Sequence, residues 1–377
     1  MFFNISRYLG RFKLVGCVVR NFLILLVGLV FSVNALANPN LGLPPLNIPA
    51  DNPQTAEKIA LGKRLFNDKH FSADGTISCA SCHQEDKAFT DGLPVAVGIN
   101  GQAGTRNTPT LINAAFFETL FLDGRASSLE AQVLGPMLNP IEHGLQDQQV
   151  IVDLIRQDRS YTEAFRKAFA IKVDEINISH VTKAIASFER TLISGDSLFD
   201  RHLFGRDHTA LSSSAERGLT IFKNKGNCVT CHEISWNNAL FTDNRFYNIG
   251  VGFKQLTPVL DKFIAFVRQG NNPDYFPLTA VQRSELGRFN VTKNLADIGK
   301  FKTPTLRNIA LTAPYMHDGS MKTLEEVIDH YDIGGDQNRF IDSKIFPLHL
   351  TTQEKQDLVA FMQALTSSKS PNHPTGE

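Results

Sequence analysis

Two stretches decide the fold: Cys79-Ala80-Ser81-Cys82-His83 and Cys228-Val229-Thr230-Cys231-His232. In each, two thiols separated by two residues can form thioethers with the vinyl groups of one haem, and the adjacent histidine can bind its iron. Disulfides, a redox dithiol or a zinc site would also use paired cysteines. The histidine after each pair, and the lack of further Cys-His pairs in the sequence, favour haem. The sequence therefore predicts two covalently bound haem c groups.

The sequence around the two motifs is also repeated. Phe89-Thr90-Asp91-Gly92 follows the first motif and Phe241-Thr242-Asp243-Asn244 follows the second. Further on, Thr108-Pro109-Thr110-Leu111 matches Thr303-Pro304-Thr305-Leu306. Such repeats indicate two copies of one structural unit.

Helical patterns dominate the chain. Amphipathic helices are expected before each motif, at residues 56–66 and 215–222, the second with a capping box of Ser213 and Glu216. Strand patterns are sparse and short. We therefore expect a mainly α fold of two tandem cytochrome c-like domains related by internal duplication, at residues 38–205 and 206–368.

The N-terminus resembles an export signal. Basic residues precede an apolar run at residues 22–33, which ends in Ala35-Leu36-Ala37. A membrane anchor is the alternative, but spanning a bilayer takes roughly 20 apolar residues. We expect residues 1–37 to be a cleaved signal peptide and the mature chain to be periplasmic without membrane insertion. Residues 369–377 should form a disordered tail.

The equivalent positions of the two repeats differ at one point that matters for iron. A helix is expected from Thr323 through Tyr331 and is ended by Gly334-Gly335, whereas the counterpart of Tyr331 in the first repeat is Pro136. A tyrosine oxygen can bind iron and a proline cannot. The sequence predicts one closed and one open haem. Met316, His317 and His330 are competing ligands, and Tyr331 could instead be a packed aromatic residue.

Two polar residues, Gln132 and Glu142, lie near Pro136 in the sequence. A carboxylate beside an open haem can take a proton from one oxygen of a peroxide and return it to the other. A glutamine can hold the peroxide or the carboxylate by hydrogen bonds. Either residue could also be an ordinary solvated polar group.

Together these motifs resemble the bacterial di-haem cytochrome c peroxidases, the group that includes MauG, over nearly all of the mature chain. The resemblance also rests on Asp123-Gly124-Arg125-Ala126, Asn139-Pro140-Ile141-Glu142 and the segment 313–319. It implies a peroxidatic haem on His83 and an electron-transfer haem on His232. It places the catalytic residues on Glu142, Gln132 and Pro136, the sixth ligand of the second haem on Tyr331, and a calcium ion on Asn107, Thr312 and Pro314.

Two departures from that family pattern alter the expectation. Ile99 stands where the peroxidases carry a distal histidine, which predicts a first haem open to peroxide at rest. Leu122 replaces the tryptophan between the haems, so aromatic relay through that point is lost. The only tryptophan, Trp236, is expected to pack against the second haem.

The expected activity is reduction of hydrogen peroxide at the first haem, with electrons supplied through the second by a small cytochrome c or cupredoxin. A MauG-like oxidase that modifies a side chain of a partner protein is the alternative. A di-haem electron carrier without catalysis is the alternative of another class. The balance of 38 basic and 38 acidic residues argues against a nucleic-acid partner. The sequence does not decide whether the protein forms a homodimer. It also leaves open the role of residues 251–293, which have no counterpart in the first repeat.

Overall fold

A computed structural model describes residue 38 and residues 40–367. The expected signal peptide and the tail at 369–377 lie outside these residues. Within them the chain is mainly α-helical, as the sequence predicts. None of the helices in this range combines the length and apolar character that a membrane crossing demands.

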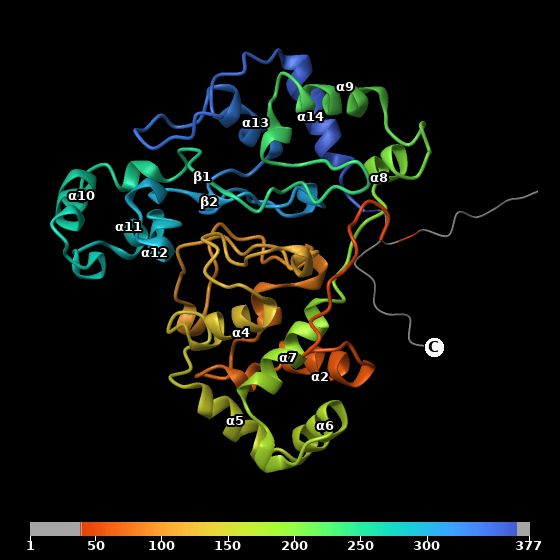
Figure 1. Cartoon of the computed structure of the whole chain (residues 1–377), viewed down its shortest axis with the longest axis vertical. Coiled ribbons are helices and arrows are strands. Elements are labelled where there is room, and N and C mark those ends of the chain that lie inside the picture. Colours follow the sequence, from red (N-terminus) through yellow and green to blue (C-terminus); the bar gives the residue numbers. More distant parts are fainter. Residues whose placement is uncertain (1–37, 39, 368–377) are drawn as a thin grey trace, which may run out of the picture. The chain divides into compact units, whose positions relative to one another are not determined.

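The regular elements are short and joined by long loops (Figure 1). Residues 40–367 contain a single pair of strands, the two-residue β1 (Phe246–Tyr247) and β2 (Phe301–Lys302), which are antiparallel. The helices are α2 (Ala56–Asn67), α3 (Cys79–Cys82), α4 (Leu129–Leu138), α5 (Gln148–Gln157), α6 (Arg159–Phe169), α7 (Ile178–Glu189), α8 (Leu198–Leu203), α9 (Ser213–Lys223), α10 (Leu260–Arg268), α11 (Ala280–Glu285), α12 (Phe289–Thr292), α13 (Leu324–Asp332) and α14 (Thr352–Gln363).

The first half is built on the packing of α2 against α7 (Figure 1). The side chain of Thr55 caps α2 by accepting a hydrogen bond from the amide of Lys58. The two backbones meet at Gly62, where an added Cβ would overlap the carbonyl oxygen of Ala184. Apolar residues of both helices, among them Phe66 and Phe188, form the core beneath this crossing.

The second half repeats this arrangement with α9 and α14. Here an added Cβ at Gly218 would overlap the carbonyl oxygen of Asp357. The expected capping box of Ser213 and Glu216 is wrong by one residue, because Ser212 has the extended backbone of a cap and accepts from the amide of Ala215.

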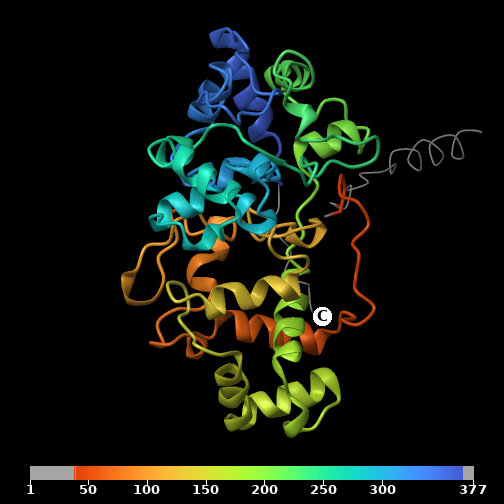
Figure 2. The ribbon, with the colours of Figure 1, turned by 60° about the vertical axis from the view of Figure 1, so that its left-hand side comes forward.

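The side chain of Phe199, in α8 and just before the expected boundary at residue 205, is fully buried in the second core. The N-terminal segment also reaches that half, since Gly42 accepts a hydrogen bond from the amide of Ala239. In Figure 2 this red segment runs from there to α2. Residues 251–293 form most of a third small core, with Phe263 and Phe289 at its centre.

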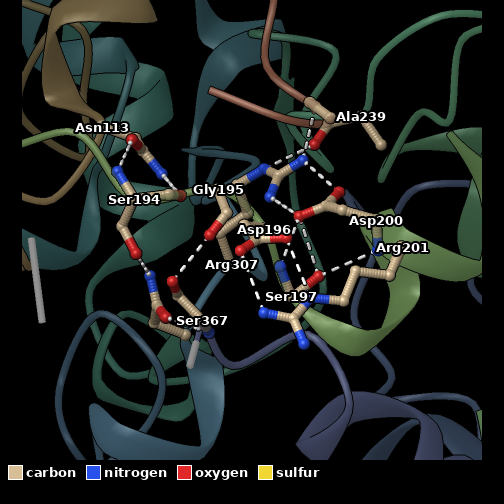
Figure 3. Close-up of polar contacts among 12 residues, drawn as sticks. Asn113, Ser194, Gly195, Asp196, Ser197, Asp200, Arg201, Ala239, Arg307 and Ser367 are labelled. Carbon is tan, nitrogen blue, oxygen red and sulfur yellow. Dashed lines mark hydrogen bonds and ion pairs between the residues drawn. The ribbon is translucent and has the colours of Figure 1, made fainter. Parts of the chain in front are cut away.

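A polar junction joins the halves, and Figure 3 shows its contacts. Asn113 accepts a hydrogen bond from the amide of Ser194, just after α7, at 2.9 Å. Asn308 accepts one from the amide of Ser367, just after α14, at the same distance. Asn308 also donates to the hydroxyl of Ser194, so the two repeated contacts are connected.

An ion pair buried from solvent completes this junction. Arg307 pairs with Asp200 of α8 at 2.8 Å and donates to the carbonyl oxygens of Ala239 and Gly42. Burying a charge is tolerated when its partners are all supplied in this way. The guanidinium therefore fixes α8 and the N-terminal segment beside the loop that follows the second motif.

Candidate haem and peroxide site

The first haem motif begins α3, and its geometry suits iron ligation by His83. A capping box of Ser78 and Ser81 holds the short helix. The Nδ1 atom of His83 lies 3.0 Å from the carbonyl oxygen of Phe89. Because a carbonyl can only accept, Nδ1 carries the proton and Nε2 is left with a lone pair for a metal. Burial lowers the pKa of His83, which keeps the imidazole neutral.

The second motif has the same arrangement around His232. Its Nδ1 lies 2.8 Å from the carbonyl oxygen of Phe241. Burial lowers the pKa of His232, against the opposing effect of the main-chain carbonyls of Phe241 and Pro304. Again Nε2 is the nitrogen with a free lone pair.

Further contacts around the two histidines also match. Thr110 donates to the carbonyl of Ala88 at 2.6 Å, and Thr305 donates to that of Leu240 at 2.7 Å. The repeated sequence is thus accompanied by repeated contacts. Each of the four motif cysteines carries a free thiol, as thioether formation requires. The residues present therefore fit two covalent haems.

Tyr331 of α13 faces the second motif. Burial raises the pKa of its hydroxyl, and the charges that Cys228 and Cys231 would carry as thiolates raise it further. The phenol therefore lies near both haem-attachment points. Because a metal ion favours the deprotonated ligand, ferric iron there would act against this rise.

Two of the competing ligands are engaged elsewhere. His317 is buried, with Nε2 2.9 Å from a carboxylate oxygen of Glu285 and its ring stacked on Phe301. The Nε2 atom of His330 lies 2.9 Å from the carbonyl oxygen of Ile249. Met316 has a left-handed backbone and is partly exposed. The contacts of the two histidines leave Tyr331 and Met316 as candidates, and Tyr331 lies near Cys228 and Cys231.

The first half has Pro136 in the corresponding helix, α4. Ser128 caps α4 as Thr323 caps α13, so Pro136 and Tyr331 occupy matching positions on their helices. Gln132 lies about one turn before Pro136 on the same helix. A proline here offers no atom that could bind iron.

Glu142 lies close to the first motif, and a hydrogen bond from a neighbouring side chain fixes its carboxylate. Burial raises the pKa of the Cys82 thiol to about 11, and the charges of Asp91 and Glu142 add to this effect. The side-chain amide of Asn139 donates to Glu142 at 2.7 Å. Burial also raises the pKa of Glu142, although Arg125 and Asn139 act in the opposite direction. A partly buried carboxylate with a raised pKa is suited to accept and return a proton.

Ile99 supports the backbone of that carboxylate. Its amide donates to the carbonyl oxygen of Glu142 at 3.0 Å, and its side chain packs on Gly144. The side chain is buried in this contact and contains no iron ligand.

Trp236 stands in a loop beside Ser235 and Asn237, and 91% of the residue is exposed on the protein chain itself. Its expected packing against the second haem stays a prediction. Leu122 is partly buried at the junction, and its carbonyl accepts a hydrogen bond from the amide of Lys302 at 2.7 Å.

Asn107, one of the residues expected to bind calcium, contacts the chain segment of the second half that carries the other two. The amide of Asn107 donates to the carbonyl of His317, and its side chain donates to Leu93 at 2.8 Å. Because Nδ2 is fixed in this way, the oxygen of the same amide remains for a cation. Thr312 and Pro314 lie just before His317 in the chain, so the segment that carries them is held to Asn107.

Residues 251–293 contribute to the junction, and the sequence did not reveal this. Arg288 donates to the carbonyl oxygens of Asp123 and Gly124. Arg106 donates to the hydroxyl and carbonyl of Ser284. Sequence reasoning also gave no role to Asn139 or Arg125, although both lie in motifs that carried the resemblance.

Comparison with known proteins agrees with this geometry. The family model described as di-haem cytochrome c peroxidase matches residues 56–208. Cytochrome-c peroxidase IdrP1 of Pseudomonas sp. (strain SCT) is 38% identical over 351 residues, covering 91% of this chain and 89% of that protein. Methylamine utilization protein MauG of Methylorubrum extorquens is 36% identical over 317 residues, covering 84% and 80%. The crystal structure of a MauG-like protein associated with microbial copper homeostasis aligns with a TM-score of 0.73 and 34% identity, covering 88% and 96%.

Proposed function

This chain belongs to the di-haem cytochrome c peroxidase family, and from that premise we propose that it reduces hydrogen peroxide at its first haem with electrons that arrive through its second. It is an oxidoreductase of the cytochrome-c peroxidase type with haem c as cofactor. The observation that carries the proposal is the partly buried Glu142, which Asn139 fixes close to the first haem motif and which follows the helix that holds Pro136. An electron carrier with two closed haems does not need a proton-accepting carboxylate at that position.

The chain's own residues handle protons and position. When bound, haem supplies an iron that takes up peroxide and exchanges electrons. Glu142 accepts a proton from one peroxide oxygen and delivers it to the other, which leaves as water. Reduction of one peroxide to two waters consumes two electrons and two protons. Gln132, one turn before Pro136, positions the peroxide or the carboxylate by hydrogen bonds.

In the second half, His232 and Tyr331 would together hold the haem iron, which would close that haem to peroxide. An anionic oxygen ligand stabilises ferric iron and lowers its reduction potential, whereas methionine raises it. The two haems therefore differ in role, one open for chemistry and one closed for electron transfer. The absence of a side-chain ligand at Ile99 keeps the first haem open at rest.

A MauG-like oxidation of a partner protein is the second candidate. The phenol of Tyr331 beside Cys228 and Cys231 favours it, because oxygen ligation suits storage of an oxidising equivalent better than acceptance of electrons. In either case the partner is a protein, either a small cytochrome c or cupredoxin that donates electrons or a substrate whose side chain is oxidised.

Location and calcium complete the proposal. Basic residues, a short apolar run and Ala35-Leu36-Ala37 support export to the periplasm with residues 1–37 as the signal. Hard oxygen ligands from Asn107, Thr312 and Pro314 suit calcium between the halves.

The test is peroxide turnover by the haem-loaded protein. We expect wild type to consume hydrogen peroxide with a reduced cytochrome c as donor, and Glu142→Gln to be slowed by about 10²–10⁴-fold, the usual contribution of a general base. Glu163→Gln, on the exposed side of α6, is the matched control and should keep full activity. Wild-type protein with two haems and no reaction with peroxide would leave only the electron carrier.

A further inference from the structure

Lys302 of β2 is a buried amine at the junction of the two halves, and the mechanism above makes no use of it. Only 6% of the surface of Lys302 is exposed. The Nζ atom lies 4.2 Å from the centre of the Phe117 ring, which belongs to the first half. Its amide donates to Leu122, also of the first half. The side chain therefore stands in the seam between the haem domains.

No oxygen in the described residues accepts a hydrogen bond from this amine. Asp243 is the carboxylate with the largest effect on it, but both Asp243 oxygens are engaged. One accepts from the amide of Arg245 at 2.9 Å and the other from the hydroxyl of Tyr247 at 2.6 Å. Burial lowers the pKa of Lys302 to about 8, and the charges of Asp243 and Glu118 only partly oppose this. A buried ammonium without an anion is costly.

The surroundings indicate which anion this amine would meet. Lys302 is followed by Thr303-Pro304, and the carbonyl of Pro304 faces the imidazole of His232. The strand that carries Lys302 thus leads directly into the residue that contacts His232. Haem brings two carboxylates of its own, and they must lie at an edge of the ring. In the first repeat the equivalent residue is Asn107, which has no charge and is tied to Leu93.

We propose that Lys302 binds a propionate of the second haem and raises the reduction potential of that haem. The residue is a positioning and electrostatic group, which acts on the cofactor and not on peroxide. The proposal requires that a haem is attached at His232. Only its consequence for electron transfer rests on the proposed function. Where Tyr331 lowers the potential of the second haem, Lys302 offsets part of that effect, so the haem remains able to take an electron from a protein donor.

The test is a potentiometric titration of the two haems without peroxide, followed by absorbance, on the haem-loaded protein. In Lys302→Met, we expect the reduction equilibrium constant of the second haem to fall roughly tenfold. This is the effect of one unit charge about 12 Å away at an effective dielectric constant of ~20. Lys302→Arg should restore the wild-type value. Lys300→Met, which removes an amine on the same segment that already pairs with Asp297, should change nothing.

A second neutral variant keeps the proposal testable if Lys302→Met does not fold. Lys302→Gln keeps a hydrogen-bond donor, so it should fold and still lose the charge effect. Equal potentials in wild type, Lys302→Met and Lys302→Gln, with both haems attached, would overturn the proposal. Because the titration uses no peroxide, a protein that fails to turn over peroxide but shows the shift would contradict the proposed function alone.

Discussion

The pKa of Glu142 results from burial, which raises it, and from Arg125 and Asn139, which lower it. The carboxyl serves as a base only when deprotonated, so peroxide reduction should be lost as pH falls through this raised pKa. Asn139→Ala removes the hydrogen bond that favours the charged form. We expect the acidic limb of the kcat/KM profile for peroxide to move to higher pH in this variant.

The matched control for that profile is Asn67→Ala, whose side-chain amide donates to the carbonyl of Lys63 at the end of α2. The acidic limb of the kcat/KM profile of Asn67→Ala should coincide with that of wild type. An Asn139→Ala profile that also coincides with wild type would mean that Glu142 is not the base that limits the reaction.

Tyr331 is the residue on which the asymmetry of the two haems depends. Tyr331→Phe keeps the ring and removes the oxygen. Electron paramagnetic resonance of the ferric protein should show wild type with one high-spin and one low-spin haem, and the variant without the oxygen-ligated low-spin signal. His330→Gln is the control, because the Nε2 atom of His330 already contacts the carbonyl oxygen of Ile249. This variant should keep the low-spin signal. A low-spin signal that survives Tyr331→Phe and disappears in Met316→Leu would assign the ligand to Met316.

Sequence reasoning was strongest for residues whose chemistry requires a fixed spacing. The two motifs and the matched Pro136 and Tyr331 depend only on covalent spacing and on helix periodicity, which the chain displays directly. The surroundings of Trp236 depend on what lies next to its loop in the folded protein, and no local pattern encodes that. The same holds for Lys302, which becomes unusual only when the two halves meet.

At the scale of elements, each half depends on a close crossing of two helices. A methyl group at Gly62 or Gly218 would overlap a carbonyl oxygen of the facing helix, so α2 and α7, or α9 and α14, would have to separate. Such overpacking costs about 1–3 kcal/mol or more. We expect Gly62→Ala and Gly218→Ala each to lower the unfolding temperature, measured by circular dichroism. Glu57→Ala, on the exposed side of α2, should not. Unchanged unfolding in both glycine variants would show that the helices have room to adjust.

Helices were predicted more reliably than their first residues. The amphipathic patterns at 56–66 and 215–222 correspond to α2 and α9. The cap of α9 was misplaced because Ser212 and Ser213 are chemically equivalent as caps, and only the backbone angles distinguish them. The helix expected from Thr323, next to which no second cap candidate stands, does have Thr323 as its cap.

At the scale of the molecule, the junction between the halves was the least predictable feature. Residues 251–293 have no counterpart in the first repeat, so repeat matching gives them no position. Their polar side chains Ser284 and Arg288 bind first-half atoms, while their apolar residues form a small core of their own. The segment is therefore a structural part of the junction.

Calcium at the junction gives a prediction that involves both halves. Its proposed ligands come from Asn107 of the first half and from Thr312 and Pro314 of the second. A ligand bound only by the folded state stabilises it by about 2.7 kcal/mol at a hundredfold excess over Kd. Removal of calcium with a chelator should therefore lower the unfolding temperature by several degrees, and excess calcium should restore it.

Two variants separate the ion from the rest of the junction. Asn107→Ala should lose the bound calcium, measured by atomic emission, and should unfold at the same temperature with or without chelator. Arg288→Ala removes the contacts to Asp123 and Gly124 but none of the proposed calcium ligands. It should unfold earlier than wild type while it still binds one calcium. If Asn107→Ala retained calcium and Arg288→Ala lost it, the ion would be held by residues near Arg288, and the ligand set proposed here would be wrong.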